Sequence, residues 1–112
     1  MSGGTDFRLA MEQFRADFAR QLPERVQEAQ AHLQAALADP DDEIPLCELH
    51  RVVHKLAGSC GTFGLREIGD AARGIEDLLD GLLAQPGASR AGKLAPVAEQ
   101  FVLLAALVAQ NP

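Results

Sequence analysis

His54 is the residue whose type and setting are best suited to chemistry in this chain of 112 residues. If residues 46–63 form one α-helix turning about 100° per residue, the apolar side chains share one arc and His54 points almost directly away from it. Gly58 and Gly61 lie within roughly 40° of His54, although each glycine costs a helix about 1 kcal/mol relative to alanine. Because a neutral imidazole carries a free lone pair, this setting predicts a nucleophile or a ligand that a partner must approach closely.

Amphipathic segments on both sides of this helix indicate the scaffold that positions it. Helical repeats of apolar residues alternate with short breaks, and Pro23 and Pro45 each suit the first turn of a helix. The predicted helices cover residues 6–20, 23–38, 46–63, 65–82 and 94–108, with breaks at 39–43 and 85–89. Short connections between such helices favour an all-α fold, an antiparallel up-and-down four-helix bundle with an additional short N-terminal helix.

Length and composition agree with a single domain over residues 1–112, with a helical arm at 1–20 and the bundle at 23–110. The chain is 47% hydrophobic, and its net charge of −6 argues against a nucleic-acid-binding surface. No apolar run is long enough to span a membrane, and the N-terminus lacks the pattern of a signal sequence. We therefore expect a cytoplasmic protein, a setting that the two cysteines, Cys47 and Cys60, also fit.

The run from His54 to Gly64, followed by Leu65 and a second amphipathic helix, resembles the phosphoacceptor signature of histidine-containing phosphotransfer domains. The matching order of helices extends from about Pro23 to Ala109, but the specific part is the dozen residues after Val53. The resemblance implies that a bundle histidine takes a phosphoryl group from an aspartate of a response-regulator receiver domain and passes it to another. By position, His54 is then the phosphoacceptor, Gly58 lets the receiver approach, and Ser59 lies beside the phosphoryl group. Gly61, on the same helix face as His54, is a further supporting residue.

The chain departs from the family pattern at one position. Many family members carry a lysine three residues after the histidine, and this chain has Ala57 there. Lys55 and Arg51, about 100° and 60° around the helix from His54, offer positive charge from one flank. Lys55 is equally consistent with a solvated surface charge. We expect His50, Arg51 and Ala57 on the surface that a partner contacts.

Glu76 is a supporting residue implied by the resemblance. It lies beside the apolar stripe of the helix predicted at residues 65–82, where family members carry a Gln or Glu that hydrogen-bonds the phosphoacceptor. A carboxylate that accepts the Nδ1 proton leaves Nε2 with a free lone pair to attack phosphorus. The alternative is a boundary charge that pairs with Arg73 or Lys55.

The chemistry expected of this chain is a phosphotransfer step and not that of a kinase. A loose phosphoryl transition state needs an in-line nucleophile and charge stabilisation, which a receiver domain supplies with its acidic pocket and Mg²⁺. The chain has no glycine-rich phosphate-binding motif, so no cofactor of its own is expected. The expected partners are receiver domains and a hybrid histidine kinase, and the chain is expected to be monomeric.

Two other classes of function compete with this interpretation. Cys47, His50 and His54 lie within about 60° of one another on the helix, so they are spaced to gather around zinc, but a closed site needs a fourth ligand. A purely structural bundle that binds partner helices explains the core equally well. Neither alternative explains the glycines around His54, so we predict a phosphorelay protein with no metal site.

Overall fold

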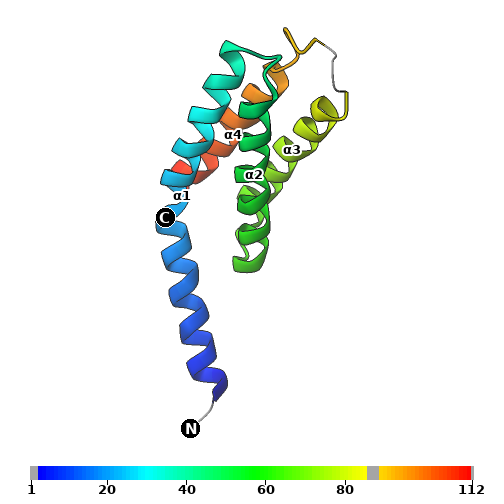
Figure 1. The fold of residues 1–112 in the computed structure, drawn as a ribbon. Helices are drawn as coiled ribbons and strands as arrows, with labels where there is room; N and C mark the ends of the chain where they lie inside the picture. Colours follow the sequence, from blue (N-terminus) through cyan, green and yellow to red (C-terminus); the bar gives the residue numbers. More distant parts are fainter. Residues whose placement is uncertain (1–2, 86–88, 112) are drawn as a thin grey trace.

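The computed structural model describes residues 3–85 and 89–111, and these residues form four α-helices and no strand. The helices are α1 (Gly3–Ala38), α2 (Glu43–Phe63), α3 (Arg66–Leu83) and α4 (Ala95–Gln110). Successive helices run in opposite directions and α4 returns to α1, which closes the bundle (Figure 1). The predicted all-α class is confirmed. The break predicted at residues 85–89 lies partly outside the described residues, between the end of α3 and the start of α4.

The core lies along the bundle axis and draws on all four helices. Each helix contributes apolar residues at three- and four-residue steps, as expected for a helix that buries one face. The most completely buried large side chains are Leu22, Leu46, Leu49, Val53, Cys60, Ile75, Leu79, Val97 and Leu104. The buried arc predicted for the helix that carries His54 is present. The buried residues of α2 are Leu46, Leu49, Val52, Val53, Leu56, Ala57 and Cys60.

The N-terminal helix is not separate from the second helix, contrary to the predicted break between residues 20 and 23. α1 continues through Pro23 from Gly3 to Ala38. A proline inside a helix leaves the carbonyl four residues earlier without its usual donor and usually kinks or breaks the helix. Here Pro23 is exposed while its neighbour Leu22 is fully buried, so the ring faces solvent and core packing holds the helix on both sides.

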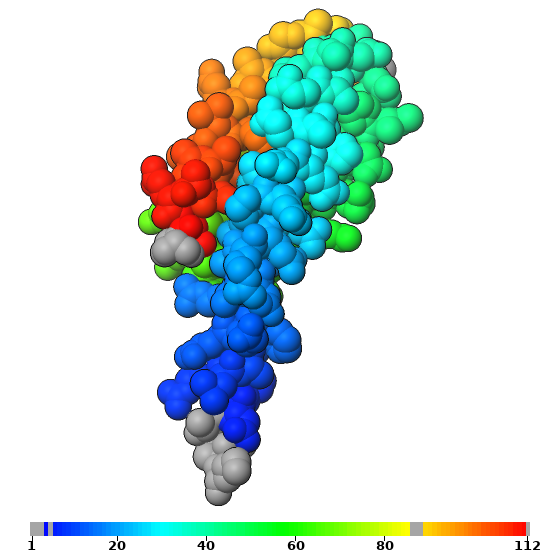
Figure 2. Space-filling view, turned by 90° about the vertical axis from the view of Figure 1, so that its left-hand side faces the viewer, coloured from blue at the N-terminus to red at the C-terminus, as the bar shows by residue number. Residues whose placement is uncertain are grey.

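The first part of α1 extends away from the bundle as an arm (Figures 1 and 2). The molecule is accordingly elongated, with principal extents of 61 × 24 × 18 Å. The arm leaves the bundle near Phe18, whose ring lies 5.3 Å from that of Phe63 at the end of α2. Two phenylalanines farther along the arm, Phe7 and Phe14, are exposed.

The helix that carries His54 has defined caps at both ends. The Asp42 side chain accepts a hydrogen bond from the backbone N–H of Ile44 at 3.0 Å, which satisfies a free donor of the first turn. At the other end Gly64 has φ +74°, and the Leu65 N–H donates to the Cys60 carbonyl at 2.9 Å. Glycine adopts this left-handed conformation without steric cost, so Gly64 ends α2 and turns the chain into α3.

A buried arginine joins the two connections at the end of the bundle far from the arm. Arg90 is 3% exposed, and its guanidinium donates to Glu43 Oε1 at 2.8 Å and to the Leu82 carbonyl at 3.3 Å. The backbone N–H of the same residue donates to Asp41 Oδ1 at 2.8 Å. We call Arg90, Asp41 and Glu43 the Arg90 latch; it fixes the start of α2 against the end of α3.

Within the described ranges, no helix combines the length and the apolar character needed to cross a membrane.

Candidate functional site

His54 lies on the outward face of α2, as the periodicity of the sequence predicts. Its side chain is 68% exposed, whereas Val53, directly before it, and Leu56, two residues after it, are buried. The helix therefore holds the imidazole in solvent while its opposite face is anchored in the core. The ring is therefore accessible to a partner, while core packing of the opposite face of α2 fixes the backbone that carries it.

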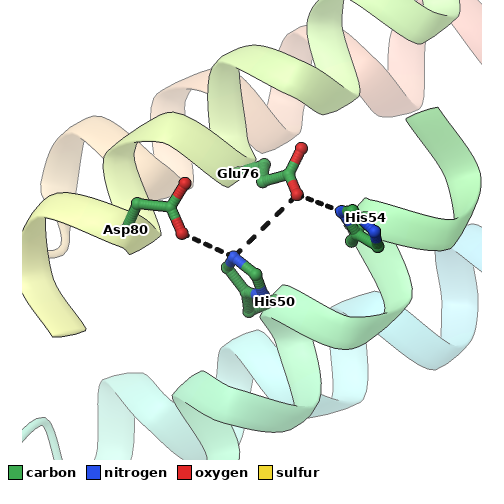
Figure 3. Close-up of polar contacts among 4 residues, drawn as sticks. All are labelled: His50, His54, Glu76 and Asp80. Atoms are coloured by element: carbon green, nitrogen blue, oxygen red, sulfur yellow. Dashed lines mark hydrogen bonds and ion pairs between the residues drawn. The ribbon is translucent and has the colours of Figure 1, made fainter. Parts of the chain in front are cut away.

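Glu76 on α3 contacts His54 through its Oε2 atom, which hydrogen-bonds the Nδ1 atom of the ring (Figure 3). Because an ionised carboxylate can only accept, Nδ1 must carry the proton of this bond. The other nitrogen, Nε2, then has its lone pair free. Glu76 is 16% exposed, so its carboxylate is held against the bundle and fixes the orientation of the ring.

A second histidine and carboxylate form a similar pair one helical turn away, but through the other ring nitrogen. His50 Nε2 lies 2.7 Å from Asp80 Oδ1 and 4.0 Å from Glu76 Oε2 (Figure 3). The two imidazole rings are nearly parallel, with centroids 6.2 Å apart. We call His50, His54, Glu76 and Asp80 the histidine cluster; two of its members come from α2 and two from α3, each pair four residues apart.

Asp80 was missed by the sequence analysis, although a signal for it was present. α2 and α3 are antiparallel neighbours, so a step of four residues forward on α2 matches a step of four residues backward on α3. Once Glu76 is placed beside His54, the residue beside His50 must be Asp80. The signal for Asp80 is therefore the matching four-residue spacing of the two histidines on α2 and the two carboxylates on α3.

The glycines beside His54 form an open surface. A Cβ atom added at Gly58 or Gly61 would meet nothing within 4 Å, so neither residue is required for packing inside the chain. Gly69 on α3 is the contrasting case, because a Cβ there would lie 3.1 Å from the Cβ of Cys60. Gly69 thus permits the close approach of α3 to α2, while Gly58 and Gly61 leave room outside the molecule.

A groove between α1 and α2 runs past His54. It has a volume of about 480 Å³, and we call it the α1–α2 groove. Its floor is apolar and its rim carries three basic residues and one acidic residue. The lining residues are Phe18, Arg25, Glu28, Arg51, Val52, His54, Lys55, Leu56, Gly58, Ser59 and Thr62. The spacing along α2 predicts Arg51, Lys55, Gly58 and Ser59 near His54. It does not predict Arg25 and Glu28, which belong to a helix distant in sequence.

One basic residue of this groove, Arg51, is held by an ion pair on its own helix. Arg51 donates to Glu48 Oε2 from Nη2 at 2.9 Å and from Nε at 3.2 Å. This ion pair lowers the pKa of Glu48 and raises that of Arg51, with the hydrogen bond as the largest cause in both residues. Both side chains are exposed, so the pair positions the guanidinium at the rim and contributes little to stability.

Ala57 does not belong to the accessible surface, which corrects its expected role as a docking residue. It is 2% exposed. The physical reason is the close packing of α3: a Cβ at Gly69 would lie 3.7 Å from the Ala57 carbonyl oxygen, so α3 covers this side of α2. His50 is partly buried within the histidine cluster, so of the three expected docking residues Arg51 has the most accessible side chain.

The cysteines and histidines of α2 do not assemble the alternative metal site. Cys47 is exposed, while the two histidines face carboxylates of α3. In residues 3–85 and 89–111 no group of three or more His, Cys, Asp and Glu side chains is arranged to hold a metal ion. Cys60 lies in the core, where burial raises the pKa of its thiol to about 11.

Fold and site together define a helical-bundle domain that presents one histidine, oriented by a carboxylate, on its surface. The model of the Hpt domain family matches residues 13–110, so the chain belongs to this family. Hpt domains are histidine phosphotransfer modules of two-component signalling, and they interact with receiver domains and kinases.

One curated relative is the chemotaxis protein CheA of Halobacterium salinarum, which is 33% identical over 70 residues. The match covers 62% of this chain but only 10% of the relative, so the chain corresponds to a small part of that protein. No solved structure matched the chain.

Proposed function

We propose that this Hpt domain is an intermediate of a multistep phosphorelay, in which His54 takes a phosphoryl group from a receiver aspartate and passes it to a second receiver. The observation that carries the proposal is the state of the His54 ring. Its Nδ1 is bound to Glu76, while the rest of the ring lies exposed beside glycines that leave the approach open. His54 is thereby poised as a nucleophile through Nε2.

The transfer step follows from this geometry. Nε2 attacks the phosphorus atom in line with the departing aspartyl oxygen, so that an N–P bond forms as the O–P bond breaks and its electron pair leaves with the receiver carboxylate. The Nδ1 proton stays on the ring, and the Glu76 carboxylate stabilises the positive charge that the imidazole acquires. A Mg²⁺ ion held by the receiver would offset the negative charge of the phosphoryl group, and the Hpt chain would need no cofactor of its own. Transfer to the second receiver is the reverse of the same step.

The surroundings of His54 support a docking partner with an acidic site. Arg25, Arg51 and Lys55 line the α1–α2 groove, which contains one acidic residue, Glu28, although the chain as a whole carries a net charge of −6. A locally basic rim on an acidic protein favours a partner surface that is negative at its centre. In this proposal Lys55 assists with charge, Ser59 neighbours the phosphoryl group, and Gly58 and Gly61 admit the receiver backbone.

The partners within the proposal are two receiver domains and a hybrid histidine kinase that phosphorylates the first of them. The chain acts in the cytoplasm and as a monomer, which are expectations from the sequence that stay predictions. The role named for the relative, chemotaxis, belongs to a protein of which this chain covers a tenth, and the geometry of His54 gives no reason to prefer that output.

The test is phosphoryl transfer from a purified, phosphorylated receiver domain. The wild-type protein should acquire a phosphate that is labile in acid and stable in alkali, as expected of phosphohistidine. His54→Gln should abolish this labelling, whereas His50→Gln, one turn away on the same helix, should retain it. Labelling that persists in His54→Gln would remove His54 as the phosphoacceptor. Stoichiometric zinc that is lost in Cys47→Ser would favour the metal-binding alternative.

A further inference from the structure

The arm of α1 carries an apolar stripe whose two outer phenylalanine rings are left exposed by the bundle. Phe7 and Phe14 are 67% and 56% exposed, and Met11 lies between them. These residues and Phe18 follow one another at steps of four, three and four residues, so they share one helix face. We call Phe7, Met11, Phe14 and Phe18 the arm stripe. Clustered exposed aromatic side chains of this kind mark an interaction surface.

The arm stripe continues the wall of the α1–α2 groove. At about 100° per residue, the other three members lie within roughly 40° of Phe18 around the helix. Phe18 itself lines the groove and packs on Phe63, the last residue of α2. The stripe therefore faces the same side as the groove and extends it beyond the end of α2, along the part of α1 that projects from the bundle (Figures 1 and 2).

We propose that the arm stripe is a second part of the docking surface, on which the receiver that exchanges phosphate with His54 rests an apolar helical face. This inference depends on the proposed function, because the occupant is the same receiver. Continuity with the groove that contains His54 is the reason for choosing this occupant. The groove supplies the charged contacts at the site of transfer, and the arm supplies apolar contacts away from it.

The dimensions permit both contacts at once. Phe63 lies nine residues beyond His54 on α2, about 14 Å along the axis, and Phe14 is four residues beyond Phe18 on the arm, about 6 Å more. A domain of 100 to 150 residues has a radius of gyration of about 13 to 15 Å, so it spans the resulting distance of about 20 Å. One receiver can therefore cover His54 and reach Phe14. Phe7, seven residues or about 10 Å farther along the arm, also lies within the roughly 35 Å diameter of such a domain.

A second copy of the chain fits the arm stripe less well. The stripe has the spacing of a coiled-coil seam, but Arg8 and Arg15 flank it on one side and Ala10 and Asp17 on the other. An antiparallel pair would place Arg8 of one copy beside Arg15 of the other, and a parallel pair would match no opposite charges across the seam. Phe18 is also already packed on Phe63.

Part of the arm stripe lies outside the shared family region. The family match begins at residue 13, which leaves Phe7 and Met11 beyond it. Contacts made there are additional to those of the matched domain, so the arm is suited to select one receiver among many that offer the same acidic site.

The test compares two faces of the arm. The double variant Phe7→Ala, Phe14→Ala removes the exposed rings of the stripe, and Leu9→Ala is the matched control because Leu9 is 59% exposed on the opposite face. Alanine favours the helix, so both variants should keep the fold. We expect the second-order rate of transfer from the cognate phosphorylated receiver to fall about tenfold or more in the double variant and by less than about twofold in the control. Phosphorylation by phosphoramidate, a small donor that needs no docking, should be unchanged in both.

The outcomes separate this inference from the function on which it rests. If the wild type is labelled on His54 and the double variant is labelled equally fast, the arm plays no part in docking and the inference is overturned while the proposed function stands. If no receiver labels His54 in the wild type, both proposals fail. If sedimentation shows a dimer of the wild type that the double variant loses, the arm stripe binds a second copy and the inference is overturned.

Discussion

The Arg90 latch and the histidine cluster are both built from cationic or imidazole side chains facing carboxylates, yet they differ in burial. Arg90 is 3% exposed and makes hydrogen bonds with two parts of the chain through its guanidinium. His54 is 68% exposed and has one nitrogen bound to Glu76. The first arrangement leaves no buried polar atom unpaired, and the second leaves a ring nitrogen available to a partner.

The difference teaches what each cluster contributes. A buried charge is costly unless it is fully paired, so the partners of Arg90 must stay in place and thereby fix the ends of α2 and α3. An exposed imidazole is solvated whether or not it is paired, so the contact between His54 and Glu76 adds little to stability and mainly sets which nitrogen is free. The latch should therefore govern folding, and the cluster should govern reactivity.

The largest expected effect is on stability and comes from breaking the latch. Arg90→Met should lower the free energy of unfolding by about 2 kcal/mol, because the half-exposed Glu43 carboxylate loses its partner and the Leu82 carbonyl loses a donor. The backbone N–H of residue 90, which donates to Asp41, is kept in the variant. Urea denaturation measures this change. Transfer to His54 should keep its wild-type rate at low temperature, where the variant is still folded.

Arg51→Met is the matched control for this prediction. Arg51 is also paired with a glutamate, Glu48, but on the surface. Its urea midpoint should therefore stay close to that of the wild type. If the two arginine variants were equally stable, burial would not be the property that distinguishes the two clusters.

The second effect is on reactivity and comes from removing the carboxylate that holds His54. Glu76→Ala should slow transfer from a phosphorylated receiver by about tenfold to a hundredfold, because the ring loses its fixed orientation and the stabilisation of its developing charge. Glu76→Gln should lose less, since the amide oxygen still accepts from Nδ1. Rapid-quench kinetics measures both rates. Wild-type kinetics in Glu76→Ala would mean that the contact is incidental.

The sequence was sufficient to predict those parts of the molecule that depend on local periodicity. The helices, the outward direction of His54 and the proximity of Glu76 all follow from residue spacing or from the family resemblance, and the structure has each of them. The break expected at Pro23 is absent because an exposed proline can remain in a helix that is packed on both sides of it.

The parts that could not be predicted depend on contacts between distant segments. Ala57 is covered because Gly69 lets α3 approach α2 closely. A helical wheel of α2 alone does not show this contact, because it depends on the sequences of both helices. The partners of Arg90 lie 47 and 49 residues away, and a single arginine in a connection gives no periodic signal. The groove residues Arg25 and Glu28 are near His54 only because α1 packs on α2.

The smallest effect is expected from the pair of His50 and Asp80, because the exposure of His50 lies between those of Arg90 and His54. His50 and Asp80 are in contact at 2.7 Å, but their side chains are 28% and 61% exposed. His50→Gln should therefore cost less than about 1 kcal/mol of stability. Its transfer rate should remain within about threefold of the wild type, because His50 is hydrogen-bonded to Asp80 and lies 4.0 Å from Glu76, with its ring centroid 6.2 Å from that of His54. If the transfer rate fell as far as in Glu76→Ala, the two histidines would act as one unit. His50 would then position Glu76, and Glu76 would in turn position His54.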